Sequence, residues 1–315
     1  MKNESEVYKV SQKIRNFLHD SSILKTKIYL KKDDGFWDQL WSCLDSIDDS
    51  EIATETFQQL TPGEFLKSAY IQTFGLLQVL YVQQDSVSNL NEALFGTGII
   101  FNGKYPEVIL VRNIRNETTG HPTKNTVGKS NKYCTIDRSS LSKEGFRYLI
   151  WQGDTVTEKR AVFIELINNQ GKVVLEILKS IFHKIRDLEI SHKKKFRGHN
   201  LSDLLADFGL NSFELLGQMG YDVLGRQAFK HFRQKYGEIR KGIIERYGPI
   251  EKTLRIPGTK ILIDDLDFIF SRLLKFSGDY ETNKKDIEIF SEVLVNRLKE
   301  LKTHLKEIDN EFNEK

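Results

Sequence analysis

The sequence predicts a mostly α-helical protein, and three observations favour this fold class. Apolar residues recur at helical spacing along most of the 315-residue chain, only 5 residues are proline, and lysine, glutamate, leucine and isoleucine are abundant. Hydrophobic residues make up 39% of the chain, which is enough for a sizeable core. A change of composition at 196–202 leads us to expect two helical regions, residues 1–195 and residues 196–315.

The first region is expected to be a helical bundle. Apolar residues with helical spacing predict a helix over residues 36–47. Thr61 is a suitable helix cap, Pro62 suits the first turn, and Glu64 suits the positive end of a helix. The residues that follow, 63–91, are apolar around much of the predicted helix, which indicates a central and well-buried element.

A break and a small β insertion are expected in the middle of this region. Pro106 can begin a helix, which should stop near Gly120 and Pro122 because glycine favours a left-handed cap and proline cannot continue a helix. The polar residues 123–131 are expected to form a loop. Alternating apolar residues then predict a small β-hairpin insertion near residues 132–151.

Helical periodicity returns from about residue 156 to residue 195. The second region is expected to be helical throughout. Its predicted helices lie over residues 200–208, 211–218, 221–247, 264–276 and 282–313.

Composition narrows the functional classes. The net charge of +3 is mild, so any contact with nucleic acid must come from local basic patches. Two cysteines, Cys43 and Cys134, are too few for a disulfide framework or a zinc site, and no Walker, dinucleotide or HExxH motif is present. We therefore expect no metal and no cofactor. The start of the chain lacks a signal peptide and no apolar run is long enough to span a membrane, so we expect a cytoplasmic protein.

The most informative segment runs from Arg115 to Pro122, with the sequence RNETTGHP. Arginine can clamp a phosphate and histidine can move protons near neutral pH, so Arg115 and His121 could act on RNA without a metal. Asn116 adds a neighbouring polar group. Gly120 and Pro122 break the helix, which lets the chain turn and bring His121 back toward Arg115.

The same loose spacing occurs twice more, so spacing alone does not identify a site. Arg186 precedes His192 and Arg226 precedes His231, each within an apparently unbroken helix. Residues five or six positions apart in a continuous helix point in different directions. We therefore interpret these two pairs as solvated helix surface.

The segment Arg115, Asn116 and His121, within helical surroundings, resembles the catalytic motif of the HEPN superfamily (higher-eukaryote and prokaryote nucleotide-binding proteins). The resemblance covers about residues 1–195. It implies a HEPN-like helical bundle that forms a homodimer with a composite active site. It also implies metal-independent endoribonuclease cleavage that leaves 2′,3′-cyclic phosphate ends, in a toxin or anti-phage defence effector with a possible antitoxin or sensor partner.

In this resemblance His121 is the general acid or base, Arg115 holds the phosphate, and Asn116 orients a neighbour. Asp85 would either fix Arg115 or His121 or lie on a helix surface. Arg112 would either add positive field or form an ordinary salt bridge, and Lys124 would either hold the RNA backbone or belong to a solvated loop.

Some HEPN toxins carry a tyrosine two residues after the histidine that a partner enzyme modifies. Thr123 occupies that position here, so this mode of control is not expected. The alternative function is that of a non-catalytic helical nucleic-acid-binding or scaffold protein that keeps the bundle without cleaving RNA.

Overall fold

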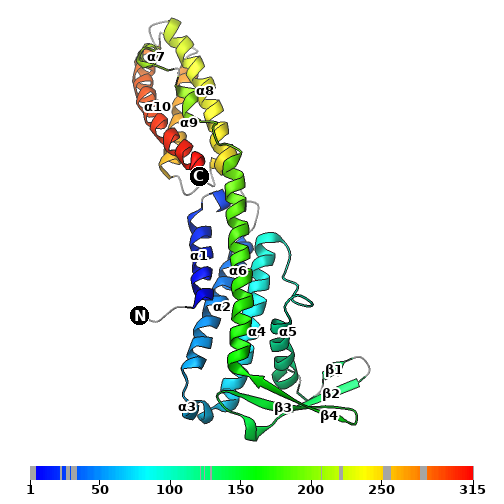
Figure 1. Cartoon of the computed structure of the whole chain (residues 1–315). Helices are drawn as coiled ribbons and strands as arrows, with labels where there is room; N and C mark the ends of the chain where they lie inside the picture. Colours follow the sequence, from blue (N-terminus) through cyan, green and yellow to red (C-terminus); the bar gives the residue numbers. More distant parts are fainter. Residues whose placement is uncertain are drawn as a thin grey trace. The chain divides into compact units, whose positions relative to one another are not determined.

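The computed structural model describes most of the chain and shows a mostly helical protein with one small antiparallel sheet (Figure 1). The described residues are 5–21, 23–25, 29, 34–120, 122–123, 125–127, 130–206, 208–219, 223–250, 257–276 and 282–314. They fold into two compact units. Unit 1 comprises Met1–Phe17 and Lys32–Ile185, and unit 2 comprises Leu18–Lys31 and Arg186–Lys315.

Unit 1 contains the helices of the first region and the whole sheet. Its helices are α1 (Glu6–Asp20, which continues into unit 2), α2 (Asp34–Gln59), α3 (Pro62–Lys67), α4 (Ala69–Phe95), α5 (Pro106–Arg115) and the first part of α6 (Phe163–Lys194). None of the described helices is long and apolar enough to cross a membrane.

The helix start predicted at Thr61 is confirmed. The Thr61 hydroxyl accepts a hydrogen bond from the Glu64 amide, and the Glu64 carboxylate accepts one from the Thr61 amide, which completes a capping box. The long helix predicted over 63–91 is interrupted, however. Ser68 separates α3 from α4, and α4 alone is buried on much of its surface.

The β insertion is larger than the predicted hairpin. Four antiparallel strands follow one another in the order β1 (Asn125–Val127), β2 (Ser130–Ile136), β3 (Gly145–Gln152) and β4 (Thr155–Val162). The pairing of β2 with β3 confirms the strand pair expected near 132–151. The expected loop at 123–131 and the expected helical start at 156 are wrong, because β1 and β4 extend the sheet on both sides.

The exposure of β4 explains why its sequence gave no strand signal. It is the last strand of the sheet, and its first six residues are exposed. Side chains that are solvated on both faces show no alternation between apolar and polar. The charged run Glu158, Lys159 and Arg160 is typical of an edge strand that must not pair with another chain.

The sheet packs against the helices of unit 1 through one face of β3. Phe146, Tyr148 and Ile150 alternate along the strand and are buried, whereas Arg147 between them is exposed. The Phe146 ring lies 5.7 Å from that of Phe163 at the start of α6. In Figure 1 the sheet lies beside the end of α5 and the beginning of α6. This packing places the end of α5 next to the sheet.

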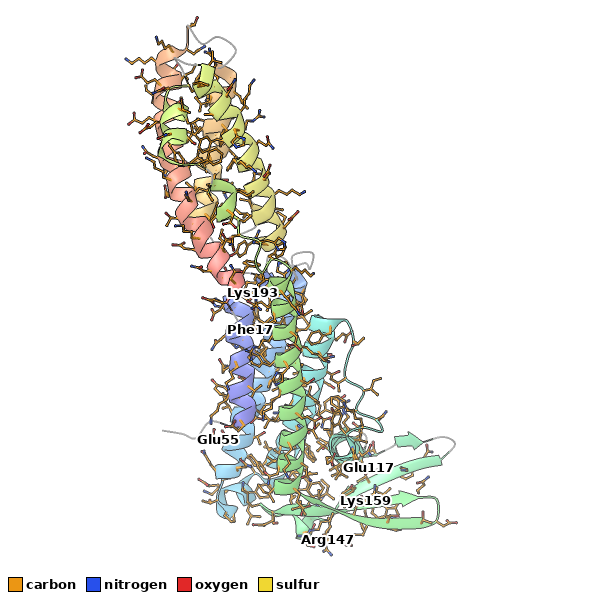
Figure 2. All side chains as sticks on the ribbon, turned by 45° about the horizontal axis from the view of Figure 1, so that its top comes forward. Phe17, Glu55, Glu117, Arg147, Lys159 and Lys193 are labelled. Atoms are coloured by element: carbon orange, nitrogen blue, oxygen red, sulfur yellow. The ribbon has the colours of Figure 1, made fainter. Side chains whose placement is uncertain are left out.

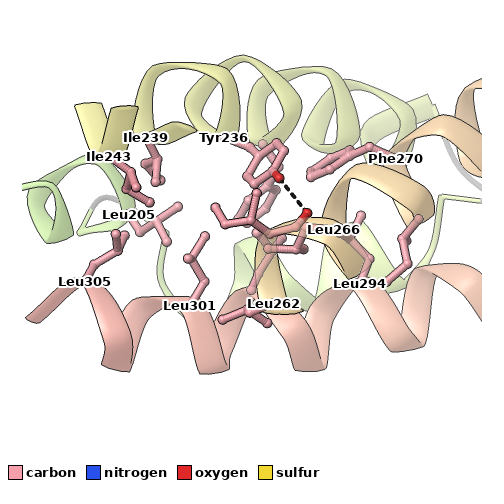
Figure 3. Packing of buried hydrophobic residues seen from close by; sticks show 14 of the residues in the cluster. Leu205, Tyr236, Ile239, Ile243, Leu262, Leu266, Phe270, Leu294, Leu301 and Leu305 are labelled. Atoms are coloured by element: carbon pink, nitrogen blue, oxygen red, sulfur yellow. Dashed lines mark hydrogen bonds between the residues drawn. The ribbon is translucent and has the colours of Figure 1, made fainter. Parts of the chain in front are cut away.

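Unit 2 is a helical domain with its own core. Its helices are the end of α6, α7 (Leu210–Gly217), α8 (Val223–Tyr247), α9 (Pro257–Phe276) and α10 (Lys284–Asn313), with a 3-10 turn at Ser202–Leu205 where a helix over 200–208 was expected. Figure 3 shows leucine, isoleucine and aromatic side chains from α8, α9 and α10 meeting in this core. The Tyr236 hydroxyl also donates a hydrogen bond to Asp267 at 2.7 Å.

Candidate functional site

The candidate site lies where α5 ends. The helical backbone continues beyond Arg115 as a π-helical turn, Asn116–Gly120, so the helix ends at Gly120 as the sequence predicted. Single π-helical turns are rare and occur frequently at functional sites. Within this turn the buried Thr118 hydroxyl donates to the carbonyl of Ile114 at 2.7 Å.

Glu117 ties the π-helical turn to the sheet. Its carboxylate accepts hydrogen bonds from the Tyr148 hydroxyl at 3.2 Å and from Lys159 Nζ at 3.3 Å. Figure 2 shows Glu117 and Lys159 where the end of α5 approaches the strands. Burial, reinforced by the Glu117 charge, raises the pKa of Tyr148, so its hydroxyl stays protonated and remains a donor. The position of the turn is therefore fixed from the sheet side.

Arg115 is held by neutral groups. Its Nε and Nη2 donate to Gln78 Oε1 on α4 at 3.2 and 3.0 Å, and its Nη1 donates to Asn116 Oδ1 at 3.1 Å. The guanidinium carbon lies 4.6 Å from the centre of the Tyr81 ring. No carboxylate in the described part of the chain pairs with Arg115. Its positive charge therefore remains available to an anion.

Arg112 lies beside Arg115 but is paired differently. Its guanidinium carbon lies 4.8 Å from the Tyr81 ring centre and 5.3 Å from that of Phe101. Its Nη2 forms an ion pair with Asp85, so Arg112 makes an ordinary salt bridge and Asp85 contacts Arg112 instead of Arg115. Asp85 therefore offsets the charge of Arg112 and leaves that of Arg115 unopposed.

A chain of buried amides leads from Arg112 into the bundle. Arg112 Nε donates to Gln84 Oε1 at 2.7 Å, and Gln84 Nε2 donates to Gln170 Oε1 at 2.6 Å. Gln170 Nε2 then donates to Gln83 Oε1 at 2.8 Å, and Gln83 Nε2 donates to the carboxylate of Glu51. All links donate in the same direction, from a cation to an anion, which allows each bond to polarise the next.

Sequence reasoning missed these glutamines. Gln83, Gln84 and Gln170 are at most 2% exposed, although glutamine is usually found at the surface. A signal was present in the sequence, because Gln170 lies three residues after Ile167 and four before Val174, on the apolar face of its helix. A polar residue on such a face needs a buried partner, and the partners here come from α4.

Gly120 lies against Arg115. A Cβ atom at Gly120 would lie 2.9 Å from Arg115 Nη1 and 3.5 Å from Asn116 Oδ1. Only glycine therefore leaves the guanidinium where it is. On the far side of the motif the carbonyl of Pro122 accepts a hydrogen bond from the Cys134 amide of β2 at 2.8 Å. His121, which falls between these two anchored residues in the sequence, and Lys124 lie outside the described residues.

The two other arginine–histidine pairs have ordinary surroundings. His192 is 7% exposed and its Nε2 lies 2.8 Å from the Arg246 carbonyl oxygen, so its interpretation as solvated surface is wrong. His231 is exposed, as expected, and its ring contacts Phe208.

The described residues of the site thus supply a fixed guanidinium and a neighbouring amide at the end of a helix. Among the described residues, no group of three or more His, Cys, Asp and Glu side chains is placed to hold a metal ion. Comparisons of the chain with protein-family models, with curated proteins and with solved structures find no match.

Proposed function

We propose that this protein is a metal-independent endoribonuclease whose active site is built on Arg115, Asn116 and His121. The observation that carries the proposal is the placement of Arg115, which is fixed by neutral partners and opposed by no carboxylate of the described chain. The resemblance of Arg115, Asn116 and His121 to the HEPN motif supports the same assignment. Gly120, which lies against Arg115, immediately precedes His121 in the sequence.

The guanidinium of Arg115 suits a phosphodiester. Three of its five N–H groups are used by Gln78 and Asn116. The other two have no acceptor in the described part of the chain and can donate to phosphate oxygens. These bonds would strengthen as negative charge grows on those oxygens in the transition state, which is how such a group accelerates a reaction.

In the proposed reaction the ribose 2′-oxygen attacks the adjacent phosphorus and the 5′-oxygen of the next nucleotide leaves. His121 takes the 2′-hydroxyl proton or supplies a proton to the leaving oxygen. The products are a 2′,3′-cyclic phosphate end and a 5′-hydroxyl end. DNA is not a substrate because it has no 2′-hydroxyl.

We also propose that two copies of the chain pair along α4 and share the site. Four large apolar side chains on α3 and the first turns of α4 are exposed, namely Leu66 (62%), Tyr70 (40%), Ile71 (74%) and Phe74 (36%). Tyr70, Phe74 and Gln78 are four residues apart and share one face of the helix. This apolar stripe therefore leads directly to the glutamine that holds Arg115, so a second copy covering the stripe would face the site.

The proposed biological setting rests on the resemblance to HEPN proteins alone. A ribonuclease of this kind would act in the cytoplasm as a toxin or an anti-phage effector with an antitoxin or sensor partner, and unit 2 would widen the dimer or sense a trigger. The competing proposal is a non-catalytic nucleic-acid-binding or scaffold protein with the same bundle.

The test compares RNA cleavage by the full chain and by two histidine variants, in the presence of EDTA. We expect His121→Ala to abolish cleavage and His231→Ala, which changes an exposed histidine of unit 2, to leave it unchanged. Equal activity of the two variants would remove His121 from the reaction. Absence of cleavage by the wild-type chain both with and without EDTA would favour the binding or scaffold protein.

A further inference from the structure

Unit 1 contains a cavity that lies outside the proposed catalytic site. It has a volume of about 740 Å³ and lies between the first turn of α1 and parts of α2, α4 and α6. Arg112, Arg115 and Asn116 do not line it. A cavity of this size is within the range that small organic ligands occupy.

One wall of the cavity is polar and lacks a cation. Glu51 is partly buried, and its two carboxylate oxygens accept hydrogen bonds from the Ser5 hydroxyl and from Gln83 Nε2. Both partners are neutral, and no cationic side chain of the described chain pairs with Glu51. A partly buried carboxylate without a positive partner is costly, so this wall favours a positively charged ligand.

Thr54 adds a second polar group to the same wall. It lies three residues after Glu51 on α2, so both side chains are on one face of the helix. Thr54 is 7% exposed, and its hydroxyl has no hydrogen-bond partner. Buried hydroxyl groups normally have a partner, and a ligand in the cavity could provide one.

Another part of the cavity lining is apolar and contains unused space. Leu80 and Ile167 are buried side chains that line the cavity. Gly171 lines it from the interior of α6, and a Cβ atom there would meet no atom within 4 Å. The absence of a side chain at Gly171 therefore lets the cavity reach the backbone of α6.

The carboxylates around the cavity differ in how they are paired. Three carboxylates line it, those of Glu6, Glu51 and Glu55, together with the exposed Lys172. Glu6 forms an ion pair with Lys9 at 2.9 Å, so the preference for a cationic ligand rests on Glu51. Glu51 is also the last acceptor of the amide chain that begins at Arg112, so its orientation is fixed before a ligand arrives.

We propose that this cavity binds a small amphipathic amine. The ammonium group pairs with Glu51 and donates a hydrogen bond to Thr54, and the hydrocarbon part lies against Leu80 and Ile167 beside Gly171. The proposal does not depend on RNA cleavage, because it rests on the lining of the cavity alone.

The test measures binding of three six-carbon probes to the full chain at neutral pH by calorimetry. Hexylamine is protonated, 1-hexanol is neutral and hexanoate is negatively charged. We expect hexylamine to bind at least about tenfold more tightly than hexanol, and hexanoate to show no binding. We expect Glu51→Gln to reduce the affinity for hexylamine to that for hexanol. Asp49→Asn, which removes an exposed carboxylate of α2 that does not line the cavity, should change nothing.

A second pair of variants tests the location. Gly171→Leu should abolish hexylamine binding because the new side chain fills the cavity, and Gly171→Ala should weaken it less. Unchanged tryptophan fluorescence and circular dichroism would show that the variants are folded. The proposal is overturned if wild-type chain binds no hexylamine at about 10 mM, if hexanoate binds equally well, or if binding survives Glu51→Gln or Gly171→Leu in folded protein.

Discussion

Replacing Gly120 by alanine should lower the rate of RNA cleavage and leave the free energy of unfolding almost unchanged. The new Cβ atom would lie 2.9 Å from Arg115 Nη1, whereas an ordinary contact between such atoms is about 3.5 Å. The guanidinium must therefore move by roughly half an ångström. It cannot do so without disturbing the 3.1 Å bond from Nη1 to Asn116, and the movement also changes its distance from Gln78 and Tyr81.

A displacement of this size should lower the rate of RNA cleavage substantially. A 1 Å misplacement of a catalytic group can reduce a rate by about a hundredfold, so roughly a tenfold loss is expected here. Stability should change little, because Gly120 is not among the glycines with positive φ and alanine fits its backbone. Where the backbone is unstrained, alanine in place of glycine adds about 0.4–1 kcal/mol to the free energy of unfolding, which offsets part of the collision.

The assay is the initial rate of cleavage of a fluorescent RNA, together with urea unfolding of each variant. The matched control is Gly237→Ala on α8, where the added Cβ would meet nothing within 4 Å. The control should keep full activity. Wild-type activity of Gly120→Ala would refute the role of Arg115, and a loss of activity accompanied by unfolding would refute the claim that only the guanidinium moves.

Three further outcomes are expected. Gln170→Leu removes three buried hydrogen bonds and leaves Gln83 Oε1 without a donor, which should destabilise unit 1 by about 3 kcal/mol. Denaturant unfolding followed by tryptophan fluorescence measures this change, because all 3 tryptophans belong to unit 1. A change below about 0.5 kcal/mol in the free energy of unfolding would contradict the buried amide chain. Phe74→Asp should convert a dimer into a monomer in sedimentation velocity, whereas Ile261→Asp, at an exposed isoleucine of unit 2, should leave the dimer intact. A dimer that persists with Phe74→Asp would exclude the α4 stripe as the interface. Burial raises the pKa of both cysteine thiols to about 11, so little thiolate exists at pH 8. Iodoacetamide should therefore modify the native protein much more slowly than the unfolded protein, and the rate should rise as the pH approaches 11. Equal rates for native and unfolded protein, measured by mass spectrometry, would contradict this.

Sequence periodicity was sufficient where a helix buries one face and has clear ends. The capping box at Thr61 and the glycine that ends the π-helical turn are local signals, and both can be recognised in the sequence. The edge strand β4 was not, because its exposed side chains carry no alternation. The π-helical turn itself was also missed, and so were the contacts of Glu117 with the sheet, which join residues 31 and 42 positions apart.

The contacts of the candidate site were only partly predictable. The helix break and the resemblance led to Arg115 and Asn116, and Asp85 was a further candidate, but the sequence could not tell which arginine Asp85 contacts. The answer depends on how α4 packs against α5, which brings Asp85 to Arg112 and Gln78 to Arg115. The amide chain through Gln170 joins residues more than 80 positions apart, and no local pattern reveals such a pairing.

The central claim is that Arg115 and His121 cleave RNA through attack by the 2′-hydroxyl. The most direct measurement is end-group analysis of RNA incubated with wild-type protein in EDTA. We predict 2′,3′-cyclic phosphate and 5′-hydroxyl ends, produced by wild type and absent with His121→Ala or Arg115→Ala. Ends that carry a 5′-phosphate, or cleavage that EDTA abolishes, would contradict the claim.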